Sequence, residues 1–109
     1  MPKTLTPLEL LTLIAVARLD DAAYAVPIRE EIRAVSGRSV SIAAIYGALD
    51  NLERRGLTQA AMSDPRPERG GRARRYYRLT SHGREWVRRE RDLALRMWHG
   101  VTIDARGAR

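Results

Sequence analysis

The segment between Val40 and Thr80 places the strongest constraint on how this chain can fold. It opens with SIAAIYGALDNLERRGL, and its apolar residues recur every three or four positions, at Ile42, Ile45, Leu49 and Leu52. This spacing puts them on one side of a helix. Ser41 can cap the start of that helix, and Gly56 can end it. The segment therefore predicts an amphipathic helix between Ser41 and Gly56.

Two short strand-like runs follow this helix, with an arginine-rich loop between them. Residues 57–63 carry no charge, and residues 73–79 alternate so that Tyr77 and Leu79 share one face. Two prolines and Gly70-Gly71 lie between the runs, which excludes a tight two-residue turn. The order predicts a β-hairpin that Tyr77 and Leu79 anchor on the core.

The first part of the chain carries a strong helix start. Thr6 can act as the cap, with Pro7 at the first helical position and Glu9 placed to complete a capping box. The helix is expected to run to Asp20-Asp21, and it is apolar on most of its faces. We therefore expect one side to be covered by the domain and another by a second subunit.

A second helix is expected from Ala25 or Val26 to Val35. Gly37 suits the left-handed position that often follows the end of a helix. The side chains predicted to face inward are Ile28, Ile32 and Val35.

A last helix is expected from Thr80 to about Trp98. Its apolar residues form an approximate heptad seam that Glu90 interrupts, which is typical of a helix that packs on another helix. The seam comprises Trp86, Val87, Leu93, Ala94, Met97, Trp98 and Val101. We expect the seam to support a homodimer and residues 102–109 to form a frayed tail.

Together these elements predict a mainly α-helical fold with a small β-hairpin, in the order α-α-α-β-β-α. This is the order of a winged helix-turn-helix, in which the hairpin, or wing, follows the third helix. We expect residues 1–80 to form this domain and residues 81–101 to add a C-terminal dimerisation helix to the same compact unit. A length of 109 residues suits one such domain.

The position of the charge indicates the kind of partner. The formal net charge is +7, yet residues 1–63 are neutral, whereas residues 64–78 carry six arginines against two acids. A charged loop is often only solvated, but a local basic segment with tyrosines on a neutral scaffold favours contact with a polyanion. The best candidates for phosphate or minor-groove contact are Arg72, Arg74 and Arg75.

The outward face of the helix between Ser41 and Gly56 favours close approach to another surface. Its residues are small near the start, and a helix N-terminus also favours phosphate. Because the acids and bases of this helix balance, it would supply fit more than attraction. A plain core helix is the alternative. The candidate DNA-binding residues on this helix are Ser41, Ala43, Ala44, Tyr46 and Gly47.

The two tryptophans can be core or interface residues, or they can line an aromatic pocket between two subunits. In the second case a small aromatic or hydrophobic effector would bind there. The candidate residues for this effector site or dimer interface are Leu11, Ile14, Trp86, Leu93, Met97 and Trp98.

Several other classes of function lack support. The chain has no cysteine, and His82 and His99 have no metal-binding partner spacing, so no metal or cofactor is expected. No catalytic grouping or phosphate-binding loop is present, and we expect no enzyme activity. No apolar run approaches a membrane span and the N-terminus does not resemble a signal peptide, which predicts a cytoplasmic protein without membrane contact.

The motifs resemble those of the PadR-like transcriptional regulators. The first is Tyr46-x-x-Leu49-x-x-Leu52-x-x-x-Gly56-Leu57, and the second is Gly71-Arg72-x-Arg74-Arg75-x-Tyr77-x-Leu79-Thr80-x-x-Gly83. The stretch AYAVPIREEI at residues 23–32 is similar to the same family's second helix, and the resemblance covers roughly residues 5–98. Ala25 and Ala43 stand where many relatives have glycine.

This resemblance implies a homodimeric repressor that dimerises through its C-terminal helix with help from the first helix. It implies that the dimer binds a pseudo-palindromic operator in double-stranded DNA and releases it when a small molecule binds. It implies the compact branch of the family, with a single C-terminal helix. It also implies a phosphate contact by Tyr46 and a wing contact by Arg72, Arg74 and Arg75. The alternative is a winged-helix module that binds another protein and has no specific DNA binding.

Overall fold

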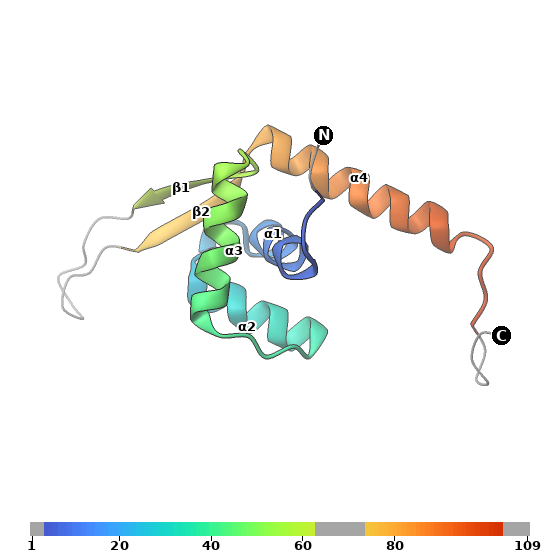
Figure 1. The fold of residues 1–109 in the computed structure, drawn as a ribbon, viewed down its shortest axis with the longest axis horizontal. Helices are drawn as coiled ribbons and strands as arrows, with labels where there is room; N and C mark the ends of the chain where they lie inside the picture. Colours follow the sequence, from blue (N-terminus) through green and yellow to red (C-terminus); the bar gives the residue numbers. More distant parts are fainter. Residues whose placement is uncertain (1–3, 63–73, 104–109) are drawn as a thin grey trace.

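The computed structural model describes residues 4–62 and 74–103. The predicted order of elements is confirmed (Figure 1). The elements are α1 (Pro7–Leu19), a 3₁₀ turn η1 (Asp20–Ala22), α2 (Ala25–Ser36), α3 (Ile42–Arg54), β1 (Thr58–Met62), β2 (Arg75–Leu79) and α4 (Ser81–Trp98).

Helix α1 lies at the centre of the core. The Thr6 hydroxyl accepts a hydrogen bond from the Glu9 amide at 3.1 Å, and the Glu9 carboxylate accepts one from the Thr6 amide at 3.0 Å, so the capping box is confirmed. Leu13 and Val16 are buried, whereas Leu11 and Ile14 remain partly exposed. The helix ends at Asp20, a non-glycine residue with a φ of 53°.

Helices α2 and α3 pack against α1 through the stripes that their periodicity predicts. Ile28 and Ile32 of α2 and Ile45, Leu49 and Leu52 of α3 are buried. Gly37 follows α2 with a φ of 76°, as predicted for the left-handed end position.

The prediction that Val35 points inward is wrong. Its side chain is 65% exposed because it lies in the last turn of α2, at the edge of a small groove between α1 and α2. Helical spacing from Ile28 and Ile32 correctly predicts which side of α2 faces the core, but α2 extends beyond the end of the core.

The hairpin is an antiparallel pair with Ala60 opposite Tyr77 and Met62 opposite Arg75. Tyr77 is 5% exposed and belongs to the main core cluster, and Leu79 packs against that cluster, so the predicted anchors are confirmed. The Tyr77 amide also donates a hydrogen bond to the Ala23 carbonyl at 2.8 Å, which joins β2 to the segment before α2.

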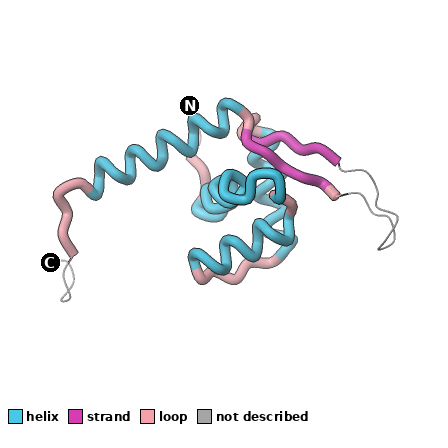
Figure 2. The backbone as a smooth tube through the Cα atoms, turned by 180° about the vertical axis from the view of Figure 1, so that it is seen from behind, coloured by secondary structure: helices cyan, strands magenta, loops and turns pink. Residues whose placement is uncertain are grey.

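Helix α4 joins the core only near its start. Trp86 and Val87 pack on a second cluster formed by Leu13, Leu52 and Leu57. Further along, the helix leaves the other elements, while the hairpin extends on the opposite side (Figures 1 and 2). Among the described residues, none of the helices combines the length and apolarity that a bilayer crossing requires.

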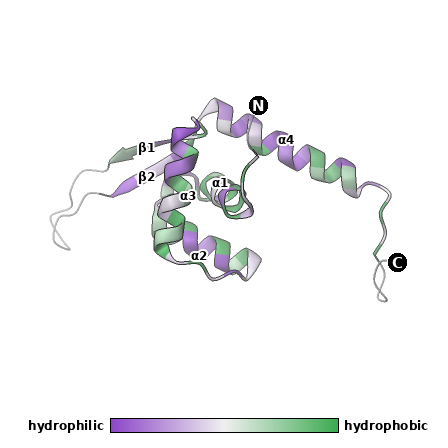
Figure 3. Cartoon of the chain, viewed as in Figure 1, coloured by the Kyte–Doolittle hydropathy of each residue, from purple (hydrophilic) through white to green (hydrophobic). Residues whose placement is uncertain are grey.

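Hydrophobic residues return in the half of α4 that lies away from the core (Figure 3). Leu93 is 46% exposed, Met97 70% and Trp98 58%. Several large apolar side chains exposed on one half of a helix are typical of an interaction site.

Candidate nucleic-acid interface

The first part of the candidate interface is the outward face of α3. Ser41 caps the helix, since its hydroxyl accepts a hydrogen bond from the Ala44 amide at 3.0 Å. Ala43, Tyr46 and Gly47 are exposed, and Ala44 is partly exposed. A Cβ atom at Gly47 would meet nothing within 4 Å, so none of the described elements covers this position. The predicted small-residue face is open to an approaching surface.

The charges of α3 are paired. Asp50 and Arg54 form an ion pair of 2.7 Å on the outward side, and both side chains are more than half exposed. Helix α3 therefore offers little net attraction to a polyanion. The hairpin is the more strongly basic neighbour.

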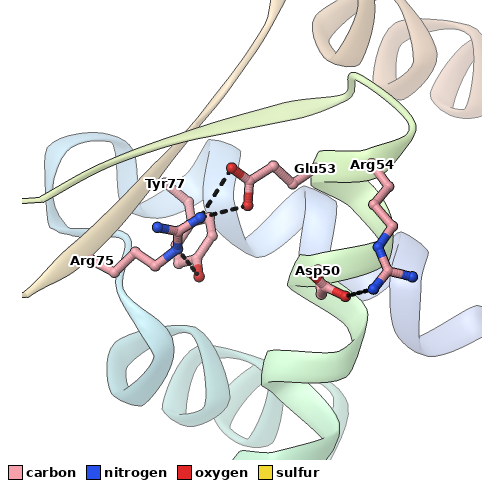
Figure 4. A network of polar contacts seen from close by, with 5 residues as sticks. All are labelled: Asp50, Glu53, Arg54, Arg75 and Tyr77. Atoms are coloured by element: carbon pink, nitrogen blue, oxygen red, sulfur yellow. Dashed lines mark hydrogen bonds and ion pairs between the residues drawn. The ribbon is translucent and has the colours of Figure 1, made fainter.

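Arg75 connects the hairpin to α3 (Figure 4). Its Nη2 donates to both carboxylate oxygens of Glu53, at 2.8 and 3.0 Å, and its Nε donates to the Tyr77 hydroxyl at 3.1 Å. The hydrogen bond to Glu53, followed by that to Tyr77, raises the pKa of Arg75. Burial raises the pKa of Tyr77, so its phenol stays neutral while it accepts this bond.

Arg74 directly precedes β2 and contacts aromatic rings. Its guanidinium lies 4.6 Å from the centre of the Tyr24 ring, within the range of a cation–π contact. Tyr24 and Tyr76 meet edge to face, with ring centres 5.4 Å apart. The two tyrosines thus hold Arg74 at the loop end of the paired strands, beside the start of α2.

The predicted contact Arg72 lies outside the described residues, as does the hairpin tip over residues 63–73. Tyr24 and Glu53 were not identified as site residues from the sequence. Tyr24 is 50 positions from Arg74, and Glu53 is 22 positions from Arg75, so only the tertiary fold brings these pairs together.

The candidate effector and dimer residues fall into three places in one chain. Leu11 and Ile14 line the small apolar groove between α1 and α2. Trp86 packs on the chain's own core and carries the Arg55 guanidinium 5.6 Å above its ring. The exposed part of α4 holds Leu93, Met97 and Trp98.

The two histidines do not form a metal-binding cluster with other described residues. Within residues 4–62 and 74–103, no three His, Asp or Glu side chains gather closely enough to hold a metal ion. His82 and His99 are exposed.

A three-helix core, an uncovered face on its third helix and an arginine-bearing hairpin directly after that helix define a winged helix-turn-helix protein. The chain belongs to the transcriptional regulator PadR-like family, whose family model matches residues 13–89. Members of this family regulate transcription and are not enzymes.

Solved structures share this fold at low sequence identity. A PadR family transcription regulator from Clostridium difficile R20291 is 22% identical with a TM-score of 0.65, covering 86% of this chain and 88% of that one. RosR from H. salinarum is also 22% identical, with a TM-score of 0.71 and coverage of 92% and 83%. A PadR-like transcription factor from Bacteroides fragilis is 20% identical, with a TM-score of 0.69 and coverage of 83% and 82%. No curated protein sequence matches the chain significantly.

Proposed function

We propose that this regulator binds its DNA sites as a homodimer and represses transcription until a small effector molecule binds. The observation that carries the proposal is the uncovered small-residue face of α3 next to the arginine-bearing hairpin. The family supplies the general role of a DNA-binding regulator. The geometry of the described residues supports separate roles for α3 and the hairpin in DNA binding.

Helix α3 would enter the major groove and read the operator by fit. Ser41, Ala43, Ala44 and Gly47 lie in its N-terminal half, where short side chains permit close approach to base edges. Tyr46 is 52% exposed and carries a hydroxyl that can donate to a phosphate. The Asp50–Arg54 pair keeps the helix nearly neutral, so sequence preference should depend on shape more than on charge.

The hairpin would supply the attraction to the phosphate backbone. Arg74 is the described residue best placed for this, because its guanidinium is held against Tyr24 at the loop end of the paired strands. We propose Arg72 as a second contact. Each phosphate that an arginine neutralises makes the logarithm of affinity fall more steeply with the logarithm of salt, by roughly 0.9.

The exposed apolar part of α4 supports dimerisation. An apolar surface of this kind on Leu93, Met97 and Trp98 is costly to leave in water, and a second copy of α4 would cover it. The partly exposed Leu11 and Ile14 of α1 would extend the contact. Such a dimer would place two copies of α3 about one DNA turn apart, roughly 34 Å.

A pocket for an aromatic or hydrophobic effector would need both subunits. Trp86 and Trp98 are twelve residues apart in α4, which is about 18 Å along the helix axis. One chain therefore cannot bring both rings around one small molecule. An antiparallel partner helix could place Trp98 of one chain near Trp86 of the other.

A footprint on the DNA upstream of its own gene tests the proposal. We expect two protected half-sites with the same face of the duplex covered, and loss of protection with an effector from a panel of planar aromatic compounds. If the protein protects no upstream sequence and instead captures a protein partner through α3, the alternative of a protein-binding winged helix would replace this account.

A further inference from the structure

We propose that Arg75 does not contact DNA but acts as a positioning residue, which with Glu53 and Tyr77 fixes the hairpin against α3. We call this set the wing brace. The inference rests on the proposed DNA binding. It assigns a role to Glu53, an acidic residue on the helix that would enter the groove, and it separates Arg75 from its neighbour Arg74.

The hydrogen bonds occupy the guanidinium of Arg75 on two of its three nitrogen atoms. Nη2 donates to both oxygens of Glu53, and Nε donates to Tyr77. The ion pair is partly shielded from water, since the Arg75 side chain is 45% exposed and the Glu53 side chain 33%. Charge-assisted bonds in such a setting are stronger than those between fully exposed side chains.

The brace reaches from α3 to the core through the hairpin. Glu53 lies in the last turn of α3, and Arg75 begins β2. Tyr77 is buried, and its amide is bonded to the Ala23 carbonyl at 2.8 Å. Arg75 therefore links the loop end of β2 to the end of α3 (Figure 4), and Tyr77 links the same strand to the segment before α2.

This tie has a consequence for DNA recognition. Helix α3 would read bases in the major groove, whereas the hairpin would contact the backbone beside it. A fixed geometry between the two determines which phosphates the hairpin can reach when α3 is in register. If Arg75 instead bound a phosphate through Nη2, it would leave the Glu53 carboxylate without this partner, close to the negatively charged duplex.

The substitution Glu53→Gln distinguishes a net-charge effect of Glu53 from a positioning role, because the two predict opposite changes in affinity for the duplex. Removing an acid near DNA should strengthen binding if only net charge matters. The wing brace predicts the opposite, because a neutral amide holds Arg75 more weakly and the hairpin loses its position. We expect affinity for the operator duplex to fall roughly threefold to tenfold, the change produced by losing one charge-assisted bond.

Asp50→Asn is the matched control. It also removes one acid from the exposed side of α3, but Asp50 pairs with Arg54 of the same helix and not with the hairpin. We expect this variant to bind the duplex as tightly as the wild type or more tightly. If Asp50→Asn weakened duplex binding as much as Glu53→Gln does, the loss of affinity would come from the change of charge on α3, and the brace would be overturned.

The charge-swapped variant Glu53→Arg with Arg75→Glu tests the pair directly. A brace works with either polarity, so the double variant should recover most of the affinity that Arg75→Glu alone loses. A phosphate contact by Arg75 cannot be recovered in this way. Arg74→Ala should lower the salt slope of binding by roughly 0.9 for each protomer.

Hydrogen exchange in the free protein gives a readout that needs no DNA. We expect the Tyr77 amide to exchange faster in Glu53→Gln than in the wild type, and to be unchanged in Asp50→Asn. Tighter duplex binding by Glu53→Gln or unchanged exchange at Tyr77 would each overturn the brace. A wild-type protein that binds no duplex at all would overturn the DNA-binding function on which it rests.

Discussion

Gly47 and Gly83, the two helical glycines among the described residues, meet opposite requirements. A Cβ atom at Gly83 would lie 2.0 Å from the Leu57 carbonyl oxygen, so the start of α4 can approach the chain after α3 only without a side chain there. At Gly47 the surroundings are open, and the absence of a side chain serves nothing within the described chain. This contrast separates a structural glycine from a candidate functional one.

Gly83→Ala should destabilise the protein strongly. The added methyl group must displace backbone, because the Leu57 carbonyl carbon would also lie 3.0 Å away. We expect the free energy of unfolding in urea to fall by about 3 kcal/mol, at the upper end of overpacking costs. A loss below about 1 kcal/mol would show that α4 can shift away from Leu57 at little cost.

Gly47→Ala should have the reverse profile. Alanine favours a helix interior over glycine, so we expect the free energy of unfolding to rise by roughly 0.5–1 kcal/mol. We also expect the preferred operator sequence to change in a selection from random duplexes, because the methyl group would stand on the reading face of α3. If the variant is stabilised but its preferred operator sequence is unchanged, Gly47 is not part of the DNA interface.

At the scale of elements, Thr80 joins α3, the hairpin and α4. Its hydroxyl accepts a hydrogen bond from the Gly83 amide at 3.0 Å and donates one to the Gly56 carbonyl at 2.6 Å. Its amide donates to the Leu57 carbonyl at 3.1 Å. One residue thus caps the last helix and fixes it to the end of α3.

Thr80→Ala should lower the free energy of unfolding by about 1–2 kcal/mol, since both side-chain hydrogen bonds are lost. Thr80→Ser keeps the hydroxyl and should cost much less. Thermal and urea unfolding of the two variants measure the difference. Equal losses would attribute the effect to the methyl group of Thr80 and not to its hydrogen bonds.

The elements were predictable where their signals are local. Thr6, Ser41 and Thr80 cap helices within three residues of their partners, and Gly37 ends α2 by its own backbone conformation. The hairpin anchors were predictable because strand alternation alone places Tyr77 on a face. Boundaries and the order of the fold follow from such local chemistry.

Contacts between distant segments were not predictable. Spacing in the sequence pairs Glu53 with the neighbouring arginines of α3, whereas the fold gives it Arg75. The same applies to Arg74 and Tyr24. Val35 shows the converse error, because a correct helical stripe does not reveal where the core stops.

At the scale of the whole molecule, the other described elements cover only part of α4. Its start is packed on the core, and its far half exposes large apolar side chains. We therefore propose that residues 81–101 serve dimerisation while the elements before them hold and present the DNA-binding surface. Residues 104–109 of the predicted frayed tail lie outside the described chain.

Sedimentation equilibrium tests this arrangement. The wild type should have twice the 12.3 kDa chain mass at micromolar concentration. Leu93→Glu combined with Met97→Glu should give the monomer mass, because charges on both exposed apolar positions would have to be buried. Arg96→Ala, which alters an exposed polar residue between them, should remain a dimer. A wild-type monomer at this concentration would contradict the proposal.

The salt dependence of duplex binding tests the central claim most directly. We predict that affinity for the upstream duplex falls steeply with salt, and that Arg74→Ala flattens the log–log slope by roughly 0.9 for each bound protomer. Binding to unrelated duplexes should weaken in parallel, since the hairpin contacts the backbone. Binding that is insensitive to salt, or a slope unchanged by Arg74→Ala, would contradict the account.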